Sequence, residues 1–105
     1  MAIASTIKRG VINLDSAGTF TLEAAVASKR LVVYHVTVIS DAAISVTFKS
    51  DTTAITGPIP VGANGGFSDG HGEGLFETAA GEKLDATLTG TCPAVGGFYS
   101  YRELD

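Results

Sequence analysis

Short segments rich in valine, isoleucine, threonine and aromatic residues alternate with glycine, proline, aspartate and serine along the chain. β-branched and aromatic side chains suit the half-buried surface of a sheet, whereas the intervening residue types suit turns. About eight strands at a spacing of roughly ten residues are typical of a sandwich or barrel. We therefore expect one all-β domain over residues 1–105, an antiparallel jelly-roll-like β-sandwich, with an immunoglobulin-like sandwich as the alternative. The expected strands are Ile7–Leu14, Thr19–Glu23, Arg30–Ser40, Ile44–Lys49, Ala54–Val61, Leu75–Thr78, Lys83–Thr89 and Val95–Glu103.

The segment Arg30–Ser40 is the strongest of these strands, and both of its faces are largely apolar. Such a strand is central in its sheet or lies at a subunit contact. Strict alternation places Val33 and His35 on one face and Tyr34 and Val36 on the other.

Local composition also predicts the connections. Asp41 and Ala42 predict a tight hairpin that joins Arg30–Ser40 to the next strand. The only helix candidate is Glu23–Ser28, which is too short to be stable alone or is strand continuation plus a turn. Two prolines make Ala54–Val61 an edge strand or an extended loop. The glycines of Gly62–Gly74 predict a long loop.

Charge and hydropathy limit the possible partners. The net charge is −4, and the seven basic residues are scattered, so we expect no nucleic-acid binding. The longest apolar run is far shorter than the roughly 20 residues of a membrane span, and no signal peptide is evident. We expect a soluble protein made in a cytoplasm, with no membrane partner. Only 17% of residues are charged, which suggests that a partner covers part of the surface. The single cysteine, Cys92, is expected to be a small buried apolar residue.

One loop concentrates ionisable side chains. In an extended loop Asp69, His71 and Glu73 would project to the same side, where they could hold a divalent cation such as zinc or manganese. Glycine flanks each of them, and metal ligands are usually fixed on strands or helices. The alternative is a solvated loop, which we favour. No motif for a nucleophile or a phosphate is present, so we expect neither an enzyme nor a cofactor.

Several residues are candidates for contact with a partner. His35 lies among valines, where it could be a pH-sensitive interface residue or an ordinary hydrogen-bonded one. Tyr34, Tyr99 and Tyr101 could form a platform for sugars, although strand tyrosines commonly pack with the hydroxyl at the rim.

The N-terminal residues 1–8 could form an arm that adds a strand to a neighbour. Its contact candidates are Ile3, Ser5 and Ile7.

A set of short motifs resembles small structural proteins of tailed bacteriophages and prophages. The motifs are Phe48-Lys49-Ser50, Thr56-Gly57-Pro58-Ile59, Ala63-Asn64-Gly65-Gly66, Phe76-Glu77-Thr78-Ala79-Ala80-Gly81-Glu82-Lys83-Leu84 and Val95-Gly96-Gly97. The resemblance covers roughly residues 30–101. The stretch Ser68–Gly74 departs from it as an insert-like segment.

The resemblance implies a virion component with a small β-sandwich. The implied role is a capsid decoration (cement) protein on the capsid exterior, bound to the major capsid protein or another virion protein. A head-fibre, tail or receptor- and carbohydrate-binding component is the alternative. The role suggests a homo-oligomer, with a trimer favoured because capsids have local three-fold positions. No catalytic residue is carried over.

Overall fold

The computed structural model describes residues 6–91 and 94–105, so Ile3, Ser5 and Cys92 lie outside the described residues. The described part consists of antiparallel strands and their connections, and it has no helix long and apolar enough to cross a membrane. The strands are β1 (Lys8–Leu14), β2 (Gly18–Glu23), β3 (Arg30–Ser40), β4 (Ile44–Ser50), β5 (Thr53–Ala54), β6 (Ile59–Val61), β7 (Gly65–Gly70), β8 (Phe76–Glu77), β9 (Leu84–Gly90) and β10 (Val95–Leu104).

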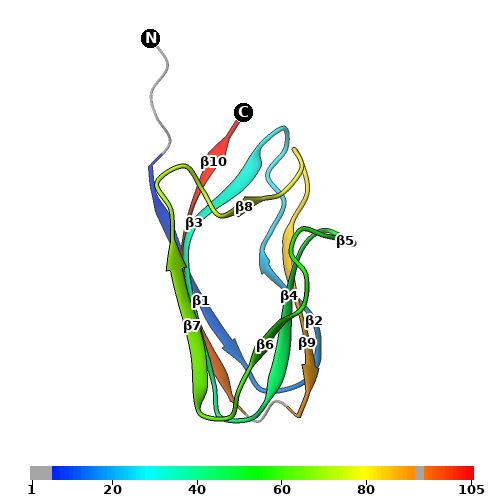
Figure 1. Ribbon diagram of the computed structural model, residues 1–105. Coiled ribbons are helices and arrows are strands. Elements are labelled where there is room, and N and C mark those ends of the chain that lie inside the picture. Colours follow the sequence, from blue (N-terminus) through cyan, green and yellow to red (C-terminus); the bar gives the residue numbers. More distant parts are fainter. Residues whose placement is uncertain (1–5, 92–93) are drawn as a thin grey trace.

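Two sheets pack face to face to form a sandwich (Figure 1). The first sheet has the order β1-β10-β3-β7, with β8 also paired to β3. The second has the order β2-β9-β4-β5, with β6 also paired to β4. With β5–β6 and β7–β8 each taken as one interrupted strand, the order is that of an eight-stranded jelly roll. The all-β jelly-roll prediction is confirmed, and the immunoglobulin-like alternative is not adopted.

The expected hairpin between β3 and β4 is wrong. The two strands belong to different sheets, and the chain crosses between the layers at Asp41. The Ser40 hydroxyl lies 2.7 Å from the Ala42 carbonyl oxygen, and Asp41 N–H donates to the Ala94 carbonyl at 3.2 Å. These bonds hold a corner rather than a tight β-turn hairpin.

Of the two alternatives for Glu23–Ser28, the short helix is absent, and strand continuation plus a turn is confirmed. Glu23 ends β2, and the chain then turns, with Lys29 N–H donating to the Val26 carbonyl at 3.1 Å. Ser28 has a φ of 64°, a left-handed conformation that a continuing helix does not allow.

The glycine-rich segment expected to be a loop contains a strand, β7, that pairs with β3. Glycine is required there by close backbone approach rather than by flexibility. A methyl group on Gly66 would come within 2.1 Å of the Val38 carbonyl oxygen. The long loop of the prediction is therefore reduced to the two turns that flank β7.

A β-bulge changes the expected faces of β3. The register with β10 shifts between Ser100 and Tyr101, which pair with His35 and Val33, so Tyr34 has no opposite residue. Val33 and Val36 consequently both face the core, and His35 faces outward. Strict alternation failed here because one extra residue reverses the side on which every later side chain lies.

The core between the sheets is apolar and continuous. Its buried residues are Ile12, Leu31, Val33, Val36, Val38, Ile44, Val46, Phe48, Val61, Leu84, Ala86, Leu88, Val95, Tyr99 and Tyr101.

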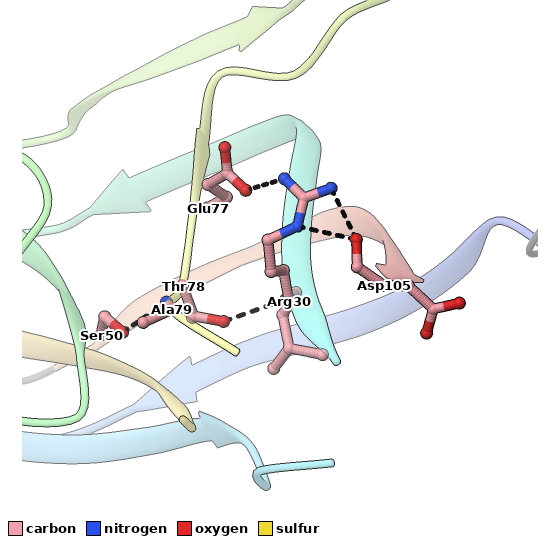
Figure 2. Close-up of polar contacts among 7 residues, drawn as sticks. Arg30, Ser50, Glu77, Thr78, Ala79 and Asp105 are labelled. Carbon is pink, nitrogen blue, oxygen red and sulfur yellow. Dashed lines mark hydrogen bonds and ion pairs between the residues drawn. The ribbon is translucent and has the colours of Figure 1, made fainter. Parts of the chain in front are cut away.

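The segment Phe76–Leu84, one of the motifs of the resemblance, crosses from one sheet to the other. Figure 2 shows its residues Glu77, Thr78 and Ala79. Thr78 is buried; its Oγ1 accepts a hydrogen bond from Leu31 N–H at 2.9 Å, and its own N–H donates to the Leu31 carbonyl at 3.0 Å. Ser50 Oγ, at the end of β4, accepts from Ala79 N–H at 2.9 Å. The segment therefore ties β3 of one sheet to β4 of the other.

An ion pair between Arg30 and Glu77 and two bonds from Arg30 to the Asp105 carbonyl, at 3.1 and 3.3 Å, surround this crossing. The Asp105 side chain pairs with Lys29, and the hydrogen bond and charge of that lysine lower the pKa of the carboxyl. These polar contacts fix the end of β10 beside the start of β3.

Candidate functional site

The three ionisable residues of the expected loop are not brought together. Asp69 lies on β7, where its Oδ1 accepts from Gly70 N–H at 2.8 Å. His71 follows β7; its N–H donates to the Tyr34 carbonyl at 2.8 Å, and its Nδ1 accepts from Glu73 N–H at 3.0 Å. Over residues 6–91 and 94–105, no three histidine, cysteine, aspartate or glutamate side chains gather as a metal site would require. These polar groups bond the local backbone.

Asp69 instead lies at the edge of an apolar groove of about 450 Å³. The groove opens between the two sheets, beside the stacked rings of Phe48 and Phe76, whose centroids are 4.8 Å apart. It is lined by Val36, Phe48, Thr56, Ile59, Phe67, Ser68, Asp69, Leu75 and Phe76. Asp69 supplies the one ionisable side chain in this lining, so the groove has no pair of groups for acid–base chemistry.

Two of the candidate contact residues, Tyr99 and Tyr101, lie in the core and not on a contact surface. The Tyr99 hydroxyl lies 2.9 Å from the Leu22 carbonyl oxygen and 2.5 Å from Glu23 Oε2. The Tyr101 hydroxyl donates to Glu23 Oε1 at 2.9 Å. The pair thus joins β10 of one sheet to β2 of the other through one carboxylate.

This environment favours the neutral phenol. Burial, followed by the hydrogen bond to Glu23 and the charge of that residue, raises the pKa of Tyr101 to about 12. The same causes in the same order raise the pKa of Tyr99 still further. The two tyrosines are structural groups that stay protonated at neutral pH.

Tyr34 and His35 lie on the outer side of the first sheet. The Arg102 guanidinium lies over the Tyr34 ring, 5.4 Å from its centroid. The His35 ring stacks on Phe98, with a centroid distance of 5.8 Å and an interplanar angle of 11°. Ser68 Oγ lies 3.4 Å from His35 Nε2. The candidate platform of three tyrosines therefore does not exist, since only Tyr34 is on this side.

Ile7 precedes β1 and is half-exposed. It lines a hollow of about 260 Å³ together with Arg9, His35, Phe98 and Ser100. Of the expected arm, residue Lys8 already belongs to β1.

Sequence reasoning missed that the exposed apolar side chains share one face. Val11 on β1, Phe98 on β10 and Ile39 on β3 are 77%, 50% and 57% exposed. The register places Val11 opposite Phe98. It places Ile39 opposite Gly96, which is two residues from Phe98 along β10. With Ile7 they are the large exposed apolar residues of the described chain. The signal in the sequence was that both faces of β3 are largely apolar. The bulge at Tyr34 changes which residues of β3 point outward, so alternation alone did not identify them.

Two hollows lie on this outer face, one of about 260 Å³ beside Phe98 and one of about 320 Å³ beside Ile39. Gly66, Ser68 and Gly70 of β7 lie opposite Ile39, Thr37 and His35, so the edge strand presents glycines and a serine there. A face of this kind offers apolar contact area, as docking surfaces do.

Comparison with protein-family models finds no match, and comparison with curated proteins and with solved structures finds no significant match.

Proposed function

We propose that this chain is a structural protein of a bacteriophage virion, a capsid decoration (cement) protein that binds the outer capsid surface and stabilises the head. The observation that carries the proposal is the exposed apolar face of the first sheet, formed by Val11, Phe98 and Ile39. Exposed apolar side chains that lie together on one face are typical of a surface that contacts a partner.

The placement of the candidate chemical groups supports a role without catalysis. Asp69 and His71 bond the local backbone, and Tyr99 and Tyr101 bond Glu23 inside the sandwich. The motif Phe76–Leu84, one of the set that resembles phage structural proteins, ties the two sheets together. A rigid small sandwich with one apolar face fits a protein whose task is attachment.

The alternative of a carbohydrate-binding tail or fibre component has less support. Sugar-binding modules stack their ligands on exposed aromatic faces. Two of the three tyrosines are buried, and Arg102 lies over the ring of Tyr34. The decoration role needs none of these rings.

The test compares capsids of the parent phage that contain or lack this protein. We expect capsids without it to rupture at a lower temperature and under milder osmotic shock, and the purified chain to restore their stability when added back. Capsids of equal stability with and without the protein would refute the cement role.

The assembly state is tested separately. The proposed trimer predicts a trimeric mass by sedimentation or light scattering, or three copies around each occupied three-fold position in an image of the particle. Monomers in solution and single, unclustered copies on the particle would refute it.

A further inference from the structure

We infer that the outer face of the β1-β10-β3-β7 sheet docks on a partner segment that is apolar at its centre and carries carboxylates at its edge. The inference deepens the proposed function and rests on it, because the partner is then an exposed segment of a capsid protein.

The centre of this face is defined by three neighbouring levels of the sheet. Val11 and Phe98 pair across β1 and β10, and Thr37 and Ser68 continue the same level across β3 and β7. On one side lies the level with Ile39, and on the other lies the level with His35. Phe98 therefore stands in the middle, half-exposed, with its ring stacked on His35.

Small residues flank this aromatic group along its own strand and form the outward side of the edge strand β7. Gly96 and Ser100 are its outward neighbours along β10, and Gly66, Ser68 and Gly70 are the outward residues of β7. At these small residues a partner backbone can approach the sheet closely and contact the Phe98 ring beside Val11 and His35. Burial of an aromatic anchor in the middle of a contact is the usual source of binding energy in an interface.

The charge of this face is opposite to that of the molecule. In the described strands the register places three cations on it, Arg9, Arg30 and Arg102, whereas Glu77 is the one carboxylate there and is paired with Arg30. The whole chain carries a net charge of −4. A partner with carboxylates at the edge of its contact segment is complementary to such a face.

The same charges argue against a second copy of this chain as the occupant. A two-fold contact brings a surface against itself, so the cationic surroundings of the patch would meet cationic surroundings. Repulsion between like charges would then oppose the apolar contact.

The patch is small. Strands lie about 4.8 Å apart and rise about 3.4 Å per residue. The patch extends across four strands and, along β1, from Arg9 to Asn13, so it measures roughly 15 by 15 Å. A stable interface buries about 800 Å² on each partner, which is more than this patch provides. We therefore expect a contact of modest affinity at each site, sensitive to single substitutions.

The experiment measures binding of the purified chain to capsids of the parent phage assembled without it. Two separate variants, Phe98→Ser and Val11→Ser, each remove apolar contact area; the Val11 side chain is 77% exposed. We expect Phe98→Ser to weaken binding by at least about tenfold, and Val11→Ser by a smaller factor. Thermal unfolding of each variant is the control, and we expect each to show the cooperative transition of a folded sandwich.

A matched charge pair tests the electrostatic part. Arg9→Gln removes one cation from the docking face, and Lys49→Gln removes one from β4 of the other sheet. We expect Arg9→Gln to weaken binding about two- to fivefold, whereas Lys49→Gln leaves it unchanged. Added salt should weaken the wild-type chain more than Arg9→Gln.

The outcomes separate the two proposals. A wild-type chain that does not bind these capsids refutes the proposed function. Wild-type binding that Phe98→Ser and Val11→Ser leave intact overturns the docking face while the function stands. Equal effects of Arg9→Gln and Lys49→Gln overturn the acidic partner. A wild-type dimer that Phe98→Ser converts to monomers assigns the face to self-association instead.

Discussion

Gly10 on β1 leaves the space that the Tyr99 ring occupies in the core. It faces inward opposite Tyr99, and a methyl group there would lie 2.1 Å from Tyr99 Cζ and 2.2 Å from its hydroxyl oxygen. We expect Gly10→Ala to reduce the free energy of unfolding by about 1–3 kcal/mol, since the ring has to move away from Glu23. Urea unfolding measures the loss. Gly72→Ala is the control, because its methyl group meets nothing within 4 Å. Equal stabilities of the two variants would contradict this prediction.

The tyrosine pair on Glu23 makes folding sensitive to alkali. The folded-state pKa of Tyr101, about 12, and the still higher pKa of Tyr99 exceed the value of about 10 for an unfolded tyrosine. The unfolded chain therefore releases these protons first as pH rises. The stabilisation is complete below about pH 10 and is lost progressively toward pH 12 and beyond, at no more than about 1.4 kcal/mol per pH unit for each tyrosine.

Urea midpoints measured between about pH 8 and pH 11 test this expectation. The variant Tyr99→Phe/Tyr101→Phe should be less stable at neutral pH, because Glu23 loses both donors, and its stability should fall less steeply in alkali. If the urea midpoint of the wild-type chain does not decrease as the pH is raised from 10 to 11, the raised tyrosine pKa values are contradicted.

The crossing segment between β8 and β9 depends on Thr78. In Thr78→Val the shape is kept, but the buried Leu31 N–H loses its acceptor. We expect a loss of about 1–3 kcal/mol in the free energy of unfolding, measured in urea. Thr21→Val on the exposed side of β2 is the matched control and should change stability little. If both variants unfold at the same urea concentration, the segment does not stabilise the crossing in this way.

Most strands could be predicted from the sequence, because alternation and β-branched residues are local signals. The errors arose where a distant contact decides the structure. Local composition predicts a loop at β7, since nothing local shows that Gly66 lies against the Val38 carbonyl. The turn residues at Asp41 predict a hairpin, because a turn residue does not reveal which sheet the next strand enters.

The candidate site was harder to predict than the fold. The bulge at Tyr34 decides which residues of β3 face outward, and it follows from pairing with β10 rather than from composition. The exposed cluster at Val11 and Phe98 joins strands from opposite ends of the chain, so only the register brings it together. Ionisable residues close in sequence, such as Asp69 and His71, predict a site, but in the structure they bond the local backbone.

At the scale of the whole molecule, net charge and the apolar face have opposite effects on solubility. The net charge is −4 at pH 7, and the isoelectric point is about 4.9. Repulsion between copies therefore disappears as the pH falls toward 5, while Val11 and Phe98 remain exposed. We expect light scattering at low salt to rise steeply between pH 7 and pH 5.

The variant Val11→Ser/Phe98→Ser separates the two causes, because it has the same charge and isoelectric point as the wild-type chain but a less apolar face. It should stay clear at the pH at which the wild-type chain scatters. Thr19→Ser/Thr21→Ser on β2 is the control and should scatter like the wild type. If all three proteins scatter equally, charge neutralisation alone causes the association, and the apolar face does not contribute to it.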